Sequence, residues 1–242
     1  MIDFHTHFLP CIDDGSKSVE MSVQMLKMSR SQGVDEIVAT PHFYASRVTP
    51  ADFVARRNAA WERLRAELTP DAPRVHLGAE VYYWSGMSHS DELSKLCIEG
   101  TNVLLLEMPF KPWTDRMKNE AASIARDGYF TVVMAHIDRY LKTEPNSTWD
   151  FLARNGALFQ LNTEPLLHEG FMMRRRALKL LRDEVIYVIA SDCHNTDTRS
   201  PNMGDAAEVI EKHIGRGAVE RLTDNARELL PASERAHKGG NF

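Results

Sequence analysis

Short apolar runs separated by longer amphipathic segments are the feature that most restricts how this chain can fold. The runs are strand-sized, and the segments between them have helical spacing, most clearly at residues 18–33, 50–68 and 115–128. Two of these three segments stop at a glycine, as helices often do. The alternation predicts a mostly parallel α/β sheet, closed as a barrel or wound open. The seven candidate strands cover residues 1–5, 36–40, 74–80, 102–107, 130–136, 157–162 and 185–192.

A polar side chain lies at or just beyond the end of every one of these runs. In a barrel of parallel strands the carboxyl ends meet on one face, where the active site is built. One polar residue at a strand end means little, but seven in seven predict a shared site. The residues are His5 with His7, His42, Glu80, Glu107, His136, Asn162, and Asp192 with His194.

The types of these residues predict a metal centre. His5 and His7 are two positions apart on an extended strand, so their imidazoles point the same way and can bind one ion together. With Asp13 or Asp14 added, the set holds five histidines and at least four carboxylates. A single ion takes about three or four protein ligands, so the set suits two or three ions that share carboxylates. Nitrogen and oxygen ligands favour manganese, iron or zinc over calcium.

The other histidines have ordinary positions. His76 lies inside a predicted strand, His213 inside a predicted helix, His89 in a loop or at a helix start, and His237 near the end of the chain. We expect these four to be structural or solvated. His168 follows the sixth run and is ambiguous, since it can line the rim of the site or lie apart from it.

Arginines near the strand ends suggest what a metal cluster would act on. Clustered metal ions activate water and stabilise both oxygens of an in-line phosphoryl transfer. Guanidinium groups complete such sites, because they hold phosphate oxygens bidentately. Arg139 lies three residues after His136, and Arg199 follows the last run; Arg47 is a weaker third candidate.

Residues 193–199 contain a cysteine and an arginine with five residues between them, the C-x5-R spacing of cysteine-dependent tyrosine phosphatases. In those enzymes a nest of backbone N–H groups holds the phosphate, and glycine allows its close approach. Here the loop has no glycine and carries Asp197. We therefore expect Cys193 to be a small filler whose replacement by alanine leaves activity largely intact.

The composition limits the remaining possibilities. With 43% hydrophobic and 26% charged residues, the chain can form a sizeable core, which we expect to be one domain at 1–230 followed by a flexible tail at 231–242. A net charge of −5 argues against a nucleic-acid binder. No stretch resembles a signal peptide or a membrane span, so we expect no membrane insertion. The three cysteines, Cys11, Cys97 and Cys193, form no disulfide framework and favour a cytoplasmic location.

Six stretches together resemble the PHP superfamily, and more closely its bacterial metal-dependent tyrosine-protein phosphatases of the CpsB/CapC type. This type is associated with capsule and exopolysaccharide operons. The resemblance runs from Met1 to the 220s, with two departures: "HIDRY" stands where the family tends to have "HPERY", and Cys193 where it often has alanine. The stretches are "IDFHTHFLPCIDDGSKS", "ATPHF", "LGAEVYY", "LLLEMPF", "AHIDRY" and "SDCHNTDTRSPNM".

The resemblance implies a distorted, TIM-like (β/α)7 barrel, the PHP fold, that holds three divalent ions, most often manganese. It also implies phosphate-binding roles for Arg139 and Arg199, and Asp14 is favoured over Asp13 as a ligand. The implied ligands are His5, His7, Glu80 and Asp192 for the first ion, Glu80, Glu107 and His136 for the second, and Asp14, His42 and His194 for the third.

The implied reaction is hydrolysis of phosphotyrosine by in-line attack of metal-bound hydroxide. A phenolate, whose parent pKa is about 10, leaves with less protonation than a serine alkoxide, so an aryl ester suits a site without an evident general acid. By resemblance, the substrate is the phosphorylated C-terminal tail of a bacterial tyrosine autokinase that controls capsule or exopolysaccharide synthesis.

Three alternatives remain open at this point. A histidinol-phosphate or other small phosphomonoester phosphatase of the superfamily is the nearest, although its members tend to have histidine where Asp14 stands. A phosphodiesterase or exonuclease is disfavoured by the acidic charge balance. A non-catalytic, metal-loaded module that docks on a kinase belongs to another class, with the basic stretch at 172–182 as its contact helix. A solvated helix face is the more ordinary interpretation of that stretch.

Overall fold

The structure, a computed structural model, describes residues 1–232. Strands and helices alternate along the chain, with three short 3-10 helices between them. The strands are β1 (Ile2–Thr6), β2 (Glu36–Ala39), β3 (His42–Phe43), β4 (Arg74–Leu77), β5 (Glu80–Tyr82), β6 (Val103–Glu107), β7 (Thr131–Met134), β8 (Leu158–Asn162) and β9 (Val188–Ala190). The helices are α1 (Val19–Ser31), α2 (Pro50–Arg65), α3 (Asp115–Arg126), α4 (Asn146–Arg154), α5 (Glu164–Leu167), α6 (Phe171–Arg182), α7 (Met203–His213) and α8 (Arg216–Glu228), and the 3-10 helices are η1 (Met87–His89), η2 (Leu93–Leu96) and η3 (Ile137–Tyr140).

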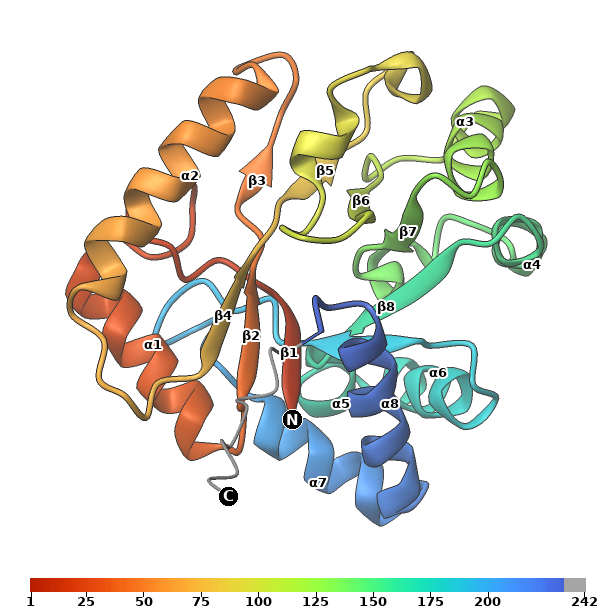
Figure 1. The fold of residues 1–242 in the computed structure, drawn as a ribbon. Coiled ribbons are helices and arrows are strands. Elements are labelled where there is room, and N and C mark those ends of the chain that lie inside the picture. The colour runs from red at the N-terminus through yellow and green to blue at the C-terminus, as the bar shows by residue number, and fades with distance from the viewer. Residues whose placement is uncertain (233–242) are drawn as a thin grey trace, which may run out of the picture.

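All of the strand pairings in the described residues are parallel, and the strands form a curled sheet (Figure 1). One part has the order β1-β2-β4, and the other has the order β3-β5-β6-β7-β8-β9. The predicted α/β class and parallel sheet are confirmed. That the sheet closes as a barrel of seven strands is a more detailed claim, and it stays a prediction.

One of the seven predicted strand runs is interrupted, and another is followed by a short additional strand. The run at 36–40 becomes β2, and β3 follows it after Pro41, a residue that has no N–H to donate to a neighbouring strand. The run at 74–80 is divided into β4 and β5 at Gly78. A β-carbon at Gly78 would lie only 3.2 Å from the side chain of Ile98, so a larger residue would require Ile98 to shift by a few tenths of an ångström. Hydrogen bonds from Gly78 N–H to Ala39 O (2.8 Å) and from Glu80 N–H to Pro41 O (3.1 Å) keep the interrupted segments side by side.

The first strand lies next to the last. The N–H of His7 donates to the carbonyl of Cys193 (2.9 Å), and the N–H of Asp192 donates to the carbonyl of His5 (2.9 Å). A parallel bridge also pairs Thr6 with Cys193. These bonds bring the two ends of the sequence, with their histidines and Asp192, to the same place in the fold.

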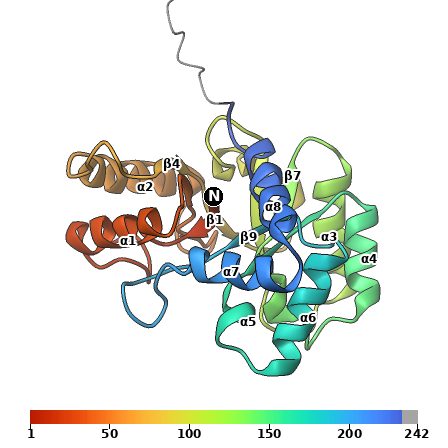
Figure 2. The same cartoon turned by 90° about the horizontal axis from the view of Figure 1, so that it is seen from below.

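Helices cover the outside of the curled sheet. Seen from below, α1 and α2 lie on one side and α3, α4 and α6 on the other, with α7 and α8 between them (Figure 2). The three predicted helices are confirmed, and each begins at a residue that caps it. The side chains of Ser18, Thr49 and Thr114 accept hydrogen bonds from N–H groups in the first turns of α1, α2 and α3.

The strands are buried on both faces, as in other parallel sheets. In β6, Leu104 and Leu106 belong to the larger hydrophobic cluster with helix residues, while Val103 and Leu105 belong to a smaller cluster. Because side chains alternate along a strand, Glu107 lies on the same face of β6 as Leu105. The smaller cluster therefore lies on the face of β6 that carries this predicted ligand.

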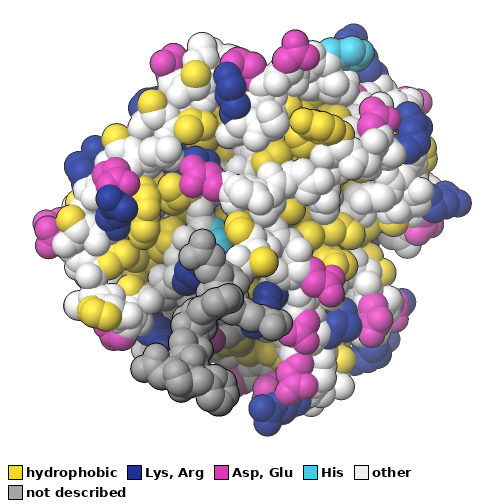
Figure 3. Space-filling view, in the orientation of Figure 1, with side chains coloured by type: hydrophobic (Ala, Val, Ile, Leu, Met, Phe, Trp, Pro, Cys, Tyr) yellow, Lys and Arg dark blue, Asp and Glu magenta, His cyan; other side chains and the backbone are white. Residues whose placement is uncertain are grey.

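No helix in residues 1–232 is long and apolar enough to cross a membrane. On the face shown in Figure 3, lysines and arginines are interspersed with aspartates and glutamates instead of being gathered by sign. The tail expected at 231–242 lies outside the described residues apart from its first two, as does His237. The domain boundary at 230 stays a prediction.

Candidate metal centre

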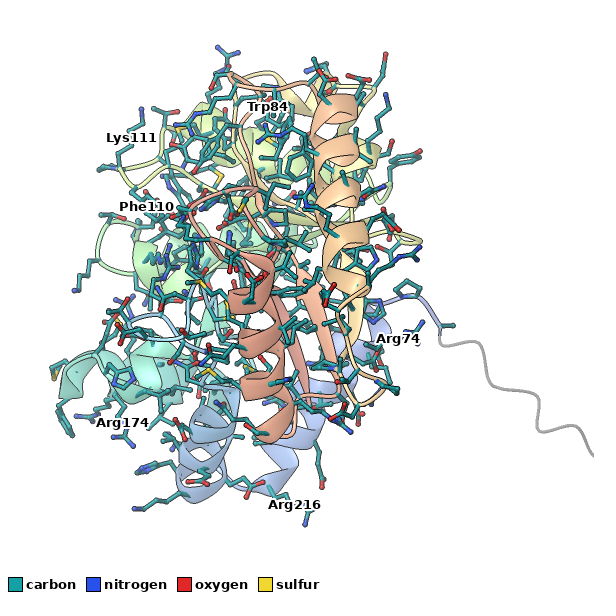
Figure 4. The ribbon with its side chains drawn as sticks, turned by 90° about the vertical axis from the view of Figure 1, so that its left-hand side faces the viewer. Arg74, Trp84, Phe110, Lys111, Arg174 and Arg216 are labelled. Atoms are coloured by element: carbon teal, nitrogen blue, oxygen red, sulfur yellow. The ribbon has the colours of Figure 1, made fainter. Side chains whose placement is uncertain are left out.

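The nine predicted metal ligands lie close together in the structure: seven of them form three groups, and His136 and Asp192 lie beside Glu80 and His5. In Figure 4, Arg74, which begins β4, lies on one side of the molecule, while Phe110 and Lys111, which follow β6, lie on the opposite side. In three groups, one nitrogen or oxygen from each residue lies within 4.8 Å of those from the others. The groups are His7, Asp14, His42 and His194; His5, His7 and Glu80; and His42, Glu80 and Glu107.

Glu80 is the centre of this cluster. Its Oε2 lies 3.3 Å from the Nε2 atoms of both His5 and His7 and 2.7 Å from Nδ1 of His42, and its Oε1 lies 2.6 Å from Nε2 of His136. Burial of Glu80 opposes ionisation, but the charge of His5 and the contacts with His136 and His42 outweigh burial and lower the pKa of the carboxyl. One carboxylate thus faces four imidazoles, as a carboxylate shared between metal ions does.

His5 and His7 turn the same nitrogen toward this centre. Their Nε2 atoms are 3.0 Å apart. Each Nδ1 has its own partner, Gln160 Oε1 for His5 (3.3 Å) and Asp13 Oδ2 for His7 (2.7 Å). With the proton on Nδ1 in both rings, both Nε2 lone pairs point into one small space. A cation placed there would relieve the repulsion between the two lone pairs. In metal sites, the ring nitrogen that does not bind the ion commonly donates to an acceptor, as both Nδ1 atoms do here.

Asp13 and Asp14 have different surroundings. Asp13 Oδ2 accepts from Nδ1 of His7 and from the backbone N–H of His42 (3.0 Å), so Asp13 orients an imidazole. The Asp14 side chain is 64% exposed, and its Oδ1 lies 3.4 Å from Nε2 of His42 and 3.5 Å from Nε2 of His194. The structure therefore brings Asp14, and not Asp13, into a group of possible metal ligands.

Gly15 explains how the two aspartates reach the site. A β-carbon at this position would lie 2.0 Å from the carbonyl oxygen of His7, a distance that no side chain tolerates. The same carbonyl accepts a hydrogen bond from Ser16 N–H (3.0 Å). The loop is thus folded tightly back on the end of β1, which holds Asp13 and Asp14 beside His7.

Asp192 connects the cluster to both predicted arginines. Its Oδ2 accepts hydrogen bonds from Nη2 of Arg139 (2.5 Å) and from Nδ2 of Asn162 (3.0 Å), and Nη2 of Arg199 lies 2.8 Å from the same oxygen. The other oxygen, Oδ1, lies 3.6 Å from Nε2 of His5. Burial opposes ionisation of Asp192, but the charges of His5 and Arg139 outweigh it and lower the pKa of the carboxyl. One oxygen faces the histidines while the other is held by cations.

Two of the cluster residues have strained backbones. His136 has a φ of 32° and Asp192 a φ of 52°, in the left-handed region that non-glycine residues rarely adopt. Each lies two residues after the end of a strand, His136 after β7 and Asp192 after β9. Such strain of about 1–3 kcal/mol is characteristic of residues held in place for function.

The third arginine lies elsewhere on the rim. The guanidinium of Arg47 stacks over the ring of Tyr44 at 4.6 Å, and that ring lies 5.4 Å from the ring of His42. Arg47 and Arg56 line a cavity of about 410 Å³ that also borders Asp14 and His42. Arg47 therefore lies near the group that contains Asp14, and not at Asp192.

The cluster contains many buried polar atoms that lack hydrogen-bond partners. Among the described residues, six buried side-chain nitrogen or oxygen atoms have none, and five of them belong to predicted ligands. Two of the five, Glu80 Oε2 and His42 Nδ1, are 2.7 Å apart but do not form a hydrogen bond with each other. Native proteins leave few buried polar atoms unsatisfied, because each one costs about 1–3 kcal/mol. The donor set fits divalent metal ions that use both nitrogen and oxygen ligands. The five atoms are His42 Nδ1, Glu80 Oε2, Glu107 Oε2, His136 Nδ1 and His194 Nε2.

The remaining histidines do not join these groups. His76 Nε2 pairs with Glu36 Oε2 at 2.9 Å, away from the cluster. His89 ends η1 and His213 ends α7. His168 is exposed after α5, and none of the three metal-binding groups found in residues 1–232 includes it.

The C-x5-R loop is not built to bind phosphate. Cys193 is fully buried, and burial raises the pKa of its thiol, which opposes formation of the nucleophilic thiolate. The N–H groups of His194 and Asn195 donate to the carbonyl of Arg199, and those of Asp197 and Arg199 donate to the side chain of Asn195. These four donors are used within the loop.

Sequence reasoning missed the positioning role of Asp13 and also missed Gln160, which binds the Nδ1 side of His5 and the N–H of His136 (2.6 Å). A signal for Gln160 was present, because it lies two residues before Asn162 and thus on the same face of β8. The exposed ring of Phe110 was missed as well. It stacks against the rings of His136 and Tyr140, and the guanidinium of Arg139 lies 5.7 Å above it.

Comparisons with known proteins agree along nearly the whole chain. Residues 1–231 match the family described as capsular polysaccharide synthesis, CpsB/CapC. Tyrosine-protein phosphatase YwqE of Bacillus subtilis is 31% identical over 95% of this chain and 91% of its own length. Tyrosine-protein phosphatase CpsB of Streptococcus pneumoniae is 30% identical over 95% of this chain and 98% of its own length.

A solved structure is similar in fold over the same extent. It comes from the crystal structures of YwqE from B. subtilis and CpsB from S. pneumoniae, described as unique metal-dependent tyrosine phosphatases. The TM-score is 0.82 at 28% identity, and the match covers 95% of this chain and 94% of the other.

Proposed function

Because the chain belongs to the CpsB/CapC family, we propose that it is a metal-dependent protein-tyrosine phosphatase. The observation that carries the proposal is the cluster of buried nitrogen and oxygen atoms without hydrogen-bond partners around Glu80. These atoms lie beside two arginines that share one carboxylate oxygen. A metal centre next to a pair of guanidinium groups is the arrangement that phosphoryl transfer needs.

Three divalent ions fit the donor set, with manganese first and iron or zinc as the alternatives. When bound, such ions lower the pKa of water to about 7 and neutralise charge on the phosphoryl oxygens. His7 is within reach of two groups, and His42 is also near Glu80 and Glu107. The proposed ligands are His5, His7, Glu80 and Asp192 for the first ion, Glu80, Glu107 and His136 for the second, and Asp14, His42 and His194 for the third.

The protein's own groups orient these ligands and the phosphate. Asp13 keeps the proton of His7 on Nδ1, and Gln160 does the same for His5. Arg139 and Arg199, which are partly exposed, hold the phosphoryl oxygens and stabilise the charge that develops on them. Asn162 stays on Oδ2 of Asp192 and fixes that carboxylate while the arginines bind phosphate.

The rim of the site favours an aryl ester over histidinol phosphate. Phe110 is 58% exposed and lies beside Arg139, so its ring offers a surface for the phenyl group of a phosphotyrosine whose phosphate is held by that arginine. The phenolate leaving group, with a parent pKa of about 10, also reduces the need for a general acid.

The proposal also covers the architecture of the fold, the substrate protein and the location in the cell. We treat β2 with β3, and β4 with β5, as single interrupted strands, which gives a seven-stranded distorted barrel with the site at the carboxyl ends. Residues 1–230 form one domain. The substrate is a phosphotyrosine protein of capsule or exopolysaccharide synthesis, in particular the C-terminal tail of a tyrosine autokinase, and the location is the cytoplasm.

The test is phosphate release from a phosphotyrosyl peptide before chelation, after chelation, and after manganese is added back. Activity that disappears with the metal and returns with it supports the proposal. Activity that survives complete metal removal contradicts it and redirects attention to Cys193. If all three states are inactive on the peptide, turnover of histidinol phosphate under the same conditions decides for the small-molecule phosphatase, and its absence for the docking module.

A further inference from the structure

A groove of about 930 Å³ lies along α6, outside the metal centre. Phe171 and Met172, which line it, are 76% and 73% exposed and are the most exposed of the large hydrophobic residues in the described part of the chain. Large apolar side chains in a hollow of the surface are typical of a binding site for another molecule. The site described above uses neither residue.

The charge of α6 indicates what kind of molecule would bind. Residues 171–182 contain four arginines, one lysine and no acidic residue. Only Lys179 has a carboxylate partner in the described structure, Asp183 in the next turn. Arg182 donates instead to the carbonyl of His213 (3.3 Å), which leaves its charge uncompensated. The groove therefore carries excess positive charge, and its complement is acidic.

The groove lies close in the fold to the segment that carries Arg139. Nη1 of Arg176 in α6 donates to the carbonyl of Leu141 (2.6 Å), two residues after Arg139, and Lys142 lines the groove. In Figure 4, Arg174 of α6 lies on the same side of the molecule as Phe110 and Lys111. A polypeptide with its phosphotyrosine at Arg139 can thus extend into the groove.

We propose that the α6 groove binds an acidic segment with an apolar side chain, on the same polypeptide as the phosphotyrosine and a few residues away from it. The proposal rests on the proposed function, because it names a feature of that enzyme's substrate. An anionic membrane is the other surface that a basic, apolar helix could meet. A protein segment is favoured because the surface is hollowed, and a hollow fits a side chain of a bound segment better than it fits a flat membrane.

The experiment compares two phosphotyrosyl peptides, one short and one extended by an acidic segment that contains leucine. The metal-loaded enzyme is tested with Arg175→Glu and Met172→Ser, and Arg74→Glu on the opposite side of the molecule is the matched control. We expect the wild type to prefer the extended peptide. Both groove variants should lose about five- to tenfold in kcat/KM for it through KM, with the short peptide unaffected. The loss from Arg175→Glu should shrink at high salt.

Several results would overturn the proposal. The extension gives no advantage to the wild type, the groove variants slow both peptides equally, or Arg74→Glu has the same effect as Arg175→Glu. Wild-type sedimentation with phosphatidylserine-rich vesicles that Arg175→Glu abolishes, without discrimination between peptides, would decide for a membrane.

A binding measurement separates this proposal from the proposed function. Fluorescence anisotropy of a labelled extended peptide with phenylalanine in place of phosphotyrosine requires no turnover. Binding that Arg175→Glu weakens, in a protein that hydrolyses neither peptide, supports the groove and removes the phosphatase. Hydrolysis of the short peptide without this binding supports the phosphatase and removes the groove.

Discussion

A buried imidazole meets a carboxylate in two regions of this molecule, with different results. Between β4 and β2, His76 and Glu36 form a single contact of 2.9 Å, and Glu36 keeps 21% of its side chain in solvent. Around Glu80, one fully buried carboxylate faces four imidazoles, and five atoms of the cluster have no hydrogen-bond partner. The residue types are the same in the two regions, and His76 is buried, as are His5, His7 and His136. Polar atoms left without partners distinguish the metal centre from the structural pair.

The largest effect on activity is expected from a change to Glu80. Replacing Glu80 by Gln removes the charge that four imidazoles share, so we expect loss of bound metal and a fall in kcat of about 10³-fold or more on a phosphotyrosyl peptide. Phosphate release and metal content by mass spectrometry measure the two effects. Glu36→Gln is the matched control in the structural pair and should retain both. Equal losses in the two variants would contradict the distinction drawn between the regions.

The next effect concerns the cations that hold Asp192. Arg139→Ala should lower kcat/KM by about 10²-fold, because a donor to the phosphoryl oxygens is lost in a partly buried site. Metal content should be unchanged, since Asp192 keeps its hydrogen bond from Asn162. Arg47→Ala, at the other side of the rim, should have a much smaller effect. Loss of metal from Arg139→Ala would mean that the arginine acts on the ligands and not on the phosphate.

A smaller effect should follow from a change to Asp13, which is hydrogen-bonded to the proposed ligand His7. Asp13→Asn keeps an acceptor for Nδ1 of His7 but removes its charge, so we expect the manganese concentration for half-maximal activity to rise about tenfold. Saturating manganese should restore most of kcat. A kcat that stays low at saturating metal would show that Asp13 does more than position His7.

Phe110 tests the aromatic part of the rim. Phe110→Ala removes a ring that lies beside Arg139, so KM for a phosphotyrosyl peptide should rise about fivefold, the scale of one aromatic contact. The comparison is with a small alkyl phosphate, for which KM should not change. An equal change for both substrates would assign the ring to packing of His136 and Tyr140 and not to substrate recognition.

Most of the ligand set can be found in the sequence because these residues lie at or just beyond the ends of apolar runs. Glu107, for example, is the last residue of an uninterrupted apolar strand. Asp14 is the exception, since it lies in the loop after β1. The same reasoning locates the helices through their amphipathic spacing and their terminal glycines. It also separates His76 from the cluster, because that residue lies inside a strand run instead of at its end.

Other features depend on contacts between distant segments and cannot be read from local patterns. Gln160 meets His5 across 155 positions of the chain. The different surroundings of Asp13 and Asp14 follow from a loop that folds onto His7, where only glycine fits at position 15. The interruption at Gly78 and the short strand β3 after Pro41 were also missed. Each residue was visible, but apolar runs alone do not show where pairing between neighbouring strands changes.

The smallest expected effect lies in the structural pair. His76→Gln should leave kcat/KM within about twofold of wild type and lower the free energy of unfolding by about 1–2 kcal/mol, measured by urea denaturation at saturating manganese. Burial lowers the pKa of His76 below its ordinary 6.5, although Glu36 opposes the shift. The unfolded chain then binds the proton more readily, so wild-type stability falls as the pH drops below about 6.5. Glutamine cannot titrate, so the difference between the two proteins should shrink as the pH falls. A difference that grows instead would mean that Glu36 stabilises a protonated His76, and the pair would then be an ion pair.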